Sequence, residues 1–71
     1  MTMPSNAIKA ERAILRMPLG SWIDVKAIGK DAQLGTSAMA KFLLRASRNC
    51  VVERKIVVKG SAKLHLWRRI V

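Results

Sequence analysis

The sequence predicts a small α+β domain in which three helices precede a β-hairpin. Residues 5–49 contain three segments whose apolar residues recur every three or four positions, the spacing of helices with one buried face. Residues 51–70 are rich in β-branched side chains and are divided by a Gly-Ser pair, a composition typical of a hairpin. A chain of 71 residues has room for one core. We therefore expect one domain over residues 5–71 and a flexible N-terminus over residues 1–4.

The balance of charge points to a polyanionic partner. Fourteen Lys and Arg residues stand against four Asp and Glu residues, which gives a formal net charge of +10. Such an excess favours DNA or RNA as the partner. The hydrophobic fraction of 51% argues against disorder, because highly charged disordered chains contain few apolar residues.

Cysteine usage and hydropathy exclude several other classes. A single Cys cannot form an internal disulfide, and one Cys with one His is too few ligands for a zinc site, so no cofactor is predicted. No apolar run approaches the ~20 residues that span a bilayer, and the first residues lack the pattern of a secretory signal. We expect no membrane association and a cytoplasmic, nucleoid-associated protein.

The first helix is predicted to begin at a cap formed by Ser5 or Asn6 and to end at Arg16 or Met17, before Pro18. Its apolar stripe is expected to consist of Ala7, Ile8, Ile14 and Leu15. Residues 21–23 are apolar and β-favouring, so we expect a minimal strand there.

The second helix is predicted to follow an Asp24 cap and to run from Val25 to Gln33 or Leu34, with Val25, Ile28 and Ala32 facing inward. Gly29 in its middle costs about 1 kcal/mol relative to Ala. We expect that the missing side chain lets the next helix cross closely. Gly35 is predicted to make the tight turn between the two helices.

The third helix, over residues 36–49, is predicted to have one apolar and one basic side. Thr36 is the expected N-cap, and Asn49 is expected to close the helix in the left-handed conformation. The apolar stripe consists of Met39, Phe42, Leu43, Ala46 and Cys50, whose thiol should be buried. Ser37, Lys41, Arg45 and Arg48 lie on the other side, joined by Leu44.

No acidic residue occurs between Ala32 and Val52. The cations of the third helix therefore have no i, i+4 partner to neutralise them, which favours nucleic-acid contact over a solvated charged face.

The hairpin is expected to pair residues 51–58 with residues 63–70. Leu64 and Leu66 are predicted to face the core and His65 the opposite side. Basic residues near its tip would either follow the phosphate backbone or guard an exposed strand edge. Arg68 and Arg69 fit both roles. Trp22 and Trp67 are expected to be packing residues.

The predicted order of elements is that of a winged helix-turn-helix. The sequence also resembles this superfamily at the positions of its pattern V-x-x-I/L, V-x-x-x-L-x-x-L and V-x-R, which are Val25, Ile28, Met39, Leu43, Ala46, Val52 and Arg54. The segment Leu66-Trp67-Arg68-Arg69-Ile70 is similar to the last strand of the pilus-operon regulators of enteric bacteria and of Z-DNA-binding domains.

The resemblance covers residues 5–71 and implies a winged helix-turn-helix fold and a DNA-binding role. The chain departs from the family pattern in two places: Gly29 stands where Ala is usual, and Asn49-Cys50 replaces a usual Gly. The Asn-x-x-x-Tyr contact pair of the Z-DNA family is absent from the third helix, so left-handed DNA is not the expected ligand.

These observations predict a small double-stranded-DNA-binding protein, a transcriptional regulator of bacterial or phage type. The third helix would enter the major groove, and the hairpin would act as the wing. The predicted DNA-binding residues of the helix are Thr36, Ser37, Ala38, Lys41, Arg45 and Arg48. Those of the wing are Lys55, Lys59, Ser61 and Lys63.

No enzyme or small-molecule substrate is predicted, because the four acids Glu11, Asp24, Asp31 and Glu53 are scattered and no phosphate-binding glycine loop occurs. Two alternatives stay open. One is an RNA-binding or ribosome-associated module, and the other is an adaptor whose wing or Leu44 docks onto transcription or replication machinery. A homodimer or a protein partner is also left open.

Overall fold

A computed structural model describes residues 5–71; residues 1–4, the predicted flexible terminus, lie outside the described residues. Three helices, α1 (Asn6–Arg16), α2 (Val25–Ala32) and α3 (Thr36–Arg48), combine with the strands β1 (Trp22–Asp24), β2 (Val52–Lys59) and β3 (Ala62–Arg69). The strands form one antiparallel sheet in the order β1-β3-β2. The predicted α+β class is confirmed, and the arrangement is winged-helix-like.

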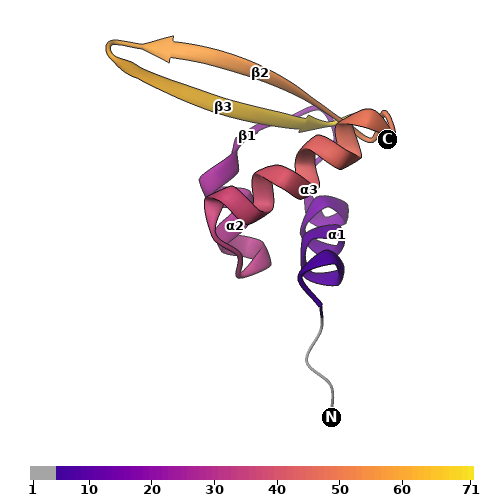
Figure 1. Cartoon of the computed structure of the whole chain (residues 1–71). Coiled ribbons are helices and arrows are strands. Elements are labelled where there is room, and N and C mark those ends of the chain that lie inside the picture. The colour runs from indigo at the N-terminus through magenta and orange to yellow at the C-terminus, as the bar shows by residue number, and fades with distance from the viewer. Residues whose placement is uncertain (1–4) are drawn as a thin grey trace.

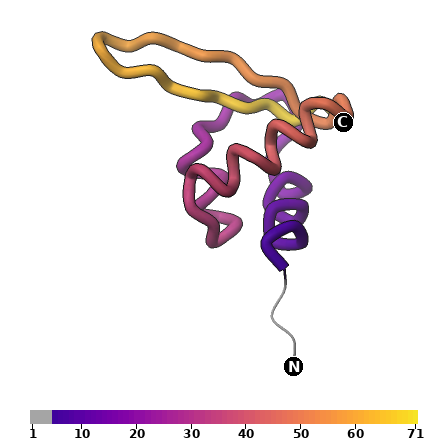
Figure 2. Tube along the Cα trace, viewed as in Figure 1, coloured from indigo at the N-terminus to yellow at the C-terminus, as the bar shows by residue number. Residues whose placement is uncertain are grey.

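The β2–β3 hairpin is long and extends past the helices (Figures 1 and 2). Lys59 pairs with Ala62, so the connecting loop is the two residues Gly60 and Ser61. Gly60 has a φ of +64°, a conformation that glycine adopts without a steric penalty. The short strand β1 pairs with the other end of β3, opposite Leu66, Trp67 and Arg68, and ties the hairpin to the helices.

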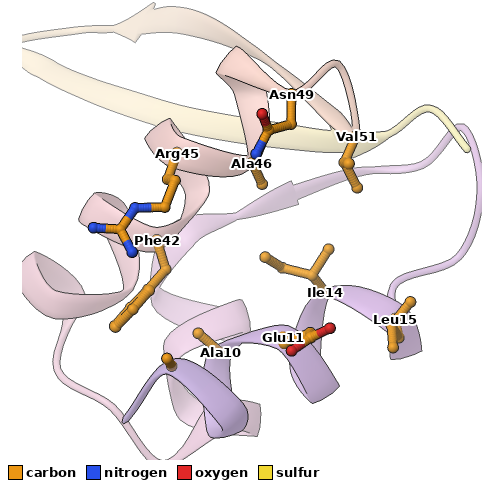
Figure 3. A pocket seen from close by; sticks show the side chains of 10 residues that line it. Ala10, Glu11, Ile14, Leu15, Phe42, Arg45, Ala46, Asn49 and Val51 are labelled. Carbon is orange, nitrogen blue, oxygen red and sulfur yellow. The ribbon is translucent and has the colours of Figure 1, made fainter.

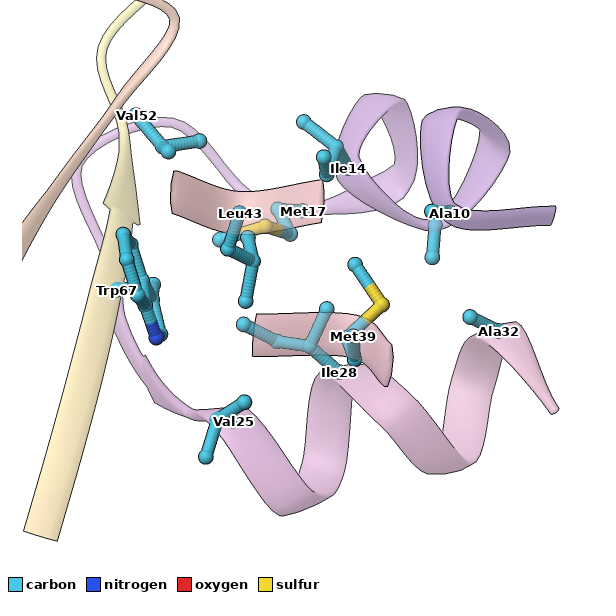
Figure 4. Close-up of a cluster of buried hydrophobic side chains, with 11 residues drawn as sticks. Ala10, Ile14, Met17, Val25, Ile28, Ala32, Met39, Leu43, Val52 and Trp67 are labelled. Atoms are coloured by element: carbon cyan, nitrogen blue, oxygen red, sulfur yellow. The ribbon is translucent and has the colours of Figure 1, made fainter. Parts of the chain in front are cut away.

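The core lies between the three helices and one face of the sheet (Figure 4). Met39 and Leu43 of α3 are completely buried at its centre. The other buried residues are Ala10, Ala13, Ile14 and Met17 from α1 and its end, Val25, Ile28 and Ala32 from α2, and Val52 and Trp67 from the sheet. The inward residues predicted for the second helix are thus confirmed.

The buried face of α1 differs from the prediction. Ile14 is buried as expected, but Ala7 is exposed, and Ile8 and Leu15 keep 43% and 58% of their surface exposed. The helix instead turns Ala10 and Ala13 inward. Small residues at a helix contact let the two backbones approach closely, whereas the prediction placed the larger apolar side chains inside.

The face of β3 that meets the core was also predicted incorrectly. Trp67 is 1% exposed and lies opposite Ile23 and Arg54, whereas Leu64 and Leu66 are half-buried on the other face. His65 therefore shares the face of Trp67. Because side chains alternate along a strand, only one of the two sets can face the core, and the indole provides the larger apolar surface to bury.

The helix ends are partly as predicted. Ser5 caps α1 by accepting from the Ile8 N–H, and Asp24 caps α2 by accepting from the Lys26 N–H. Thr36, however, is the first residue of α3; its N-cap is Gly35, which offers no side-chain hydrogen bond. The tight turn before α3 is made by Gln33, with a φ of +59°, and α2 ends at Ala32.

The left-handed residue after α3 is Cys50, with a φ of +59°, and not Asn49, whose φ is −92°. The N–H groups of Cys50 and Val51 donate to the carbonyls of Ser47 and Ala46, the pattern of a Schellman motif. In this motif the left-handed position is the first residue past the cap, which shifts it by one from the predicted residue. Cys50 is exposed, so the predicted burial of its thiol was wrong.

The missing side chain of Gly29 makes room chiefly for the α2–α3 turn, whereas the sequence predicted a close crossing by the third helix itself. A Cβ atom at this position would lie 2.9 Å from the Leu34 carbonyl oxygen and 3.5 Å from the Met39 Cβ of α3. The first distance is shorter than Cβ atoms show in protein structures, and the Leu34 oxygen belongs to the backbone, so it has little freedom to move away. Gly29 thus brings the α2–α3 turn against α2 and positions α3 over the core.

Candidate nucleic-acid interface

The outward side of α3 is lined with polar and cationic side chains. Ser37, Lys41, Arg45 and Arg48 are exposed, opposite the buried Met39 and Leu43. Leu44 is exposed among them. At the start of the helix, Thr36 is exposed and Ala38 is half-buried. Ser37, Lys41, Leu44, Arg45 and Arg48 therefore lie on one side of the helix, which we call the α3 face, whereas Thr36 and Ala38 lie on its opposite flanks.

The cations of the α3 face are not neutralised by the carboxylates of the described chain. The salt bridges among residues 5–71 join Arg16 to Asp31, at 3.0 Å between Nε and Oδ2, and Arg68 to Glu53. Neither pair involves α3, and the first turn of α3 contains no acidic residue. Asp24, the third acid, caps α2. Glu11, the fourth, makes no salt bridge within residues 5–71 but lines the groove between α1 and α3 together with Arg45. The positive charge of Lys41 and Arg48 is therefore directed to solvent, whereas that of Arg45 has one carboxylate in the same groove.

Arg45 lies at the edge of the α3 face that borders α1. Its guanidinium carbon is 6.0 Å from the centre of the Phe42 ring, and the side chain lines a groove between α1 and α3 (Figure 3). The groove has a volume of about 420 Å³, and its lining is mostly apolar. Helical spacing places Lys41 and Arg48 nearer the middle of the face, so these two side chains project most directly outward.

The predicted wing residues do not share one face of the hairpin. Residues opposite one another in an antiparallel ladder project to the same side. Lys63 pairs with Val58 and shares the helix-facing side with Trp67, whereas Lys55 and Lys59 project from the other side. Ser61 is exposed in the tip loop. The structure thus brings Lys63 to the side of α3 and separates Lys55 and Lys59 from it.

Lys55 packs on an aromatic ring at the outer face of the sheet. Its Nζ is 4.4 Å from the centre of the Trp22 ring, and the guanidinium carbon of Arg68 is 4.7 Å from the same centre. These cation–π contacts join all three strands, since Trp22 is in β1, Lys55 in β2 and Arg68 in β3. This arrangement supports the predicted packing role of Trp22 and gives Lys55 a structural contact of its own.

Arg54 was not among the predicted site residues, although it belongs to the family pattern. It is exposed, lies opposite Trp67 on the helix-facing side of the hairpin, and its guanidinium carbon is 5.5 Å from the Trp67 ring centre. The alternation of β2 contained the signal, because Arg54 is two residues from Val52, which the resemblance already placed in the core pattern.

Arg68 and Arg69, which the sequence did not separate, have different roles. Arg69 donates from Nη1 to the carbonyl oxygens of Leu15, at 2.9 Å, and Met17, at 3.2 Å. These carbonyls end α1 and have no helical partner, so Arg69 fastens the end of β3 to the end of α1. Arg68, by contrast, contacts Glu53 and Trp22 on the outer face.

Other kinds of site find little support in the described part of the chain. No group of three His, Cys, Asp or Glu side chains within residues 5–71 is arranged to hold a metal ion. None of the helices in the same range is long and apolar enough to cross a membrane.

Comparisons with known proteins give one informative result. No protein-family model matches the chain, and no curated protein matches it significantly. A solved structure described as a possible transcriptional regulator from Methanosarcina mazei Go1 is similar to it, with a TM-score of 0.72 and 16% sequence identity. The similarity covers 97% of this chain and 57% of that one, so this chain spans little more than half the length of its neighbour. At this identity the likeness shows the fold.

Proposed function

We propose that this chain is a winged helix-turn-helix domain that binds double-stranded DNA and acts in transcriptional regulation. The observation that carries the proposal is the α3 face, a row of exposed cations on a helix whose other side is fixed in the core. A protein that exposes such a row without internal carboxylate partners gains most when a polyanion supplies the opposite charge.

The geometry of α3 supports docking in the major groove, which is wide enough to admit a helix. Ser37, Ala38 and Lys41 lie in the first two turns, the part of a recognition helix that contacts base edges. In this arrangement Lys41 donates to guanine O6 or N7, and Ala38 contacts a thymine methyl group. Arg45 and Arg48, farther along, bind phosphates and set the register of the helix on the duplex.

The wing adds backbone contacts from the helix-facing side of the hairpin. Arg54 and Lys63 project from this side, and Ser61 is exposed in the tip loop that follows Lys59. Counting Arg45, Arg48, Arg54 and Lys63 as phosphate partners, the logarithm of the binding constant should fall with the logarithm of salt concentration at a slope of about −3.6.

The role in regulation rests on the fold shared with the Methanosarcina protein and on the size of the interface. A single module of this kind buries roughly 600–1,000 Å² of protein surface on DNA. Tight binding to one site therefore needs a second copy or a partner protein. A regulator of bacterial or phage type, acting by occupying its site in the cytoplasm near the nucleoid, fits these properties.

Fluorescence anisotropy with a labelled duplex at several salt concentrations tests the proposal. Arg48→Ala should weaken binding and reduce the steepness of the salt dependence by about one unit. Arg12→Ala is the matched control, since Arg12 is an exposed arginine on α1 whose removal changes the net charge equally. Equal effects of the two substitutions would leave only non-specific charge attraction and contradict a role for the α3 face.

The same assay separates DNA from RNA as the ligand. Unlabelled duplex DNA should displace the probe at lower concentrations than structured RNA at one salt concentration, because the narrow major groove of an RNA duplex excludes a helix. An adaptor role through Leu44 predicts the opposite pattern of variants. In that case Lys41→Ala with Arg45→Ala would leave partner binding intact, and Leu44→Ala would abolish it.

A further inference from the structure

The outer edge of the hairpin pairs with no other strand of residues 5–71. In the order β1-β3-β2, strand β2 has β3 on one side and, within the described part of the chain, no strand on the other. The elements that pack against β2 are β3 and α3, and the contact with α3 is at the end where Val52 is buried. The remaining edge, from Arg54 to Lys59, presents free backbone N–H and C=O groups that favour pairing with another strand.

The centre of this edge is apolar and exposed. Ile56 and Val58 keep 49% and 66% of their surface exposed, and both project from the same face of the hairpin. Together with Val57 they form a run of three β-branched residues, which have high strand propensity. The run lies in the part of the hairpin that extends past the helices, where a second molecule can reach it without meeting the helices (Figure 1).

We propose that this edge binds β2 of a second copy of the chain, in an antiparallel pair with Ile56 on the two-fold axis. This register places Glu53 of one copy, which already pairs with Arg68 of the same copy, opposite Lys59 of the other, and the symmetry makes this contact twice. Arg54 then lies opposite Val58, and Lys55 opposite Val57, so no two cations lie directly opposite one another.

Neighbouring registers are less favourable. Centring the pair on Lys55 places two lysines face to face at the axis, and centring it on Val57 places Lys55 opposite Lys59. Registers shifted by half a step are not available to this pair, because they would place residues of opposite faces opposite each other, whereas opposite residues in an antiparallel pair project to the same side. The charges of β2 thus select the Ile56 register for an otherwise strongly cationic chain.

The resulting assembly is a closed dimer with a continuous six-stranded sheet. Ile56 and Val58 of both copies gather on one side of the joint, where each contacts the isoleucine of the partner strand directly or diagonally. A two-fold contact of this kind uses the same edge on both molecules and leaves no further copy of that edge free, so it stops at two. The dimer forms without DNA and does not depend on the proposed function.

Register-specific crosslinking tests the pairing directly. In a Cys50→Ser background, Ile56→Cys places two thiols opposite each other with Cα atoms about 4.5–5.5 Å apart, which a disulfide can join. Val58→Cys is the matched control on the same strand and face; its two copies lie four residues apart along the pair, about 14 Å. Oxidised glutathione should convert the Ile56→Cys protein to a covalent dimer and leave the Val58→Cys protein mainly monomeric. Equal crosslinking of the two variants, or none, would overturn the register.

Sedimentation equilibrium tests the interface without a crosslink. The unmodified chain should show a reversible dimer at concentrations up to about 1 mM, and Ile56→Lys should abolish it. Ile8→Lys is the control, because it makes the same change at a similarly exposed isoleucine on α1, and it should leave the dimer intact. A chain that stays monomeric, a dimer that survives Ile56→Lys, or one lost through Ile8→Lys alone would each overturn the proposal.

Discussion

Substitution of Arg69 by alanine should destabilise the domain far more than the same substitution of the adjacent Arg68. Arg69 makes two hydrogen bonds from its guanidinium to the last carbonyls of α1, across more than fifty residues of sequence. Hydrogen bonds to a charged group contribute about 1.5–3 kcal/mol each, and because one of these bonds is exposed and the other only partly buried, we expect the pair to contribute less than the sum of two such bonds, about 2 kcal/mol in total.

Arg68 provides a control in the same strand, since its loss changes the net charge equally. Its contacts with Glu53 and Trp22 lie on the outer face, and its ion pair is more than one-third exposed on both sides. An exposed pair of this kind contributes about 0–1 kcal/mol. The difference between the two variants therefore isolates the attachment of β3 to α1.

Thermal unfolding followed by circular dichroism measures the difference. For a domain of this size, 1 kcal/mol corresponds to a shift of about 4–8 °C in Tm, so Arg69→Ala should lower Tm by about 8–16 °C. Arg69→Lys should recover little, because a single ammonium group cannot donate to the α1 carbonyls and also replace the 2.6 Å bond from the Arg69 Nε to the Val71 carbonyl oxygen, which holds the guanidinium in place. If Arg68→Ala and Arg69→Ala lower Tm by similar amounts, the hydrogen bonds to α1 do not stabilise the fold as argued.

Three further predictions concern helix ends and the α2–α3 contact. Gly29→Ala should lower the free energy of unfolding by about 1–2 kcal/mol, measured by urea unfolding. The added methyl group would overpack against the Leu34 carbonyl, which costs more than the ~1 kcal/mol that alanine gains in helix propensity. A variant more stable than the natural chain would refute this close contact. Cys50→Gly should stabilise the domain by about 1 kcal/mol in the same assay, because glycine adopts the left-handed conformation of this position without strain, and an unchanged or lower stability would argue against the Schellman motif. Asp24→Ala should cost about 1 kcal/mol through the loss of the 2.9 Å bond to the Lys26 N–H, whereas Asp24→Asn should retain most of the stability; equal losses would show that the cap does not act as a hydrogen-bond acceptor.

Local sequence patterns were sufficient to predict the helices and strands and the cationic side of α3. The Ser5 and Asp24 caps, the Gly60-Ser61 turn and the stripe of Met39 and Leu43 follow from contacts within a few residues of sequence. Such contacts depend on the residue types and their spacing, so they can be predicted from the chain alone. The exposure of Lys41 and Arg48 follows from the same helical periodicity.

The tertiary structure decided which of several locally acceptable faces is buried. The α1 sequence allows a buried stripe at Ile8 and Leu15 or one at Ala10 and Ala13, and only the close packing of three helices selects the alanines. In β3, the residues on each of the two faces include apolar side chains, and the face that includes Trp67 is the one that packs against the core. The separate roles of Arg68 and Arg69 have the same origin, because adjacent strand residues face opposite sides and meet partners distant in sequence. Sequence by itself determined the elements and their charge, and long-range packing, which local spacing does not encode, determined their orientation.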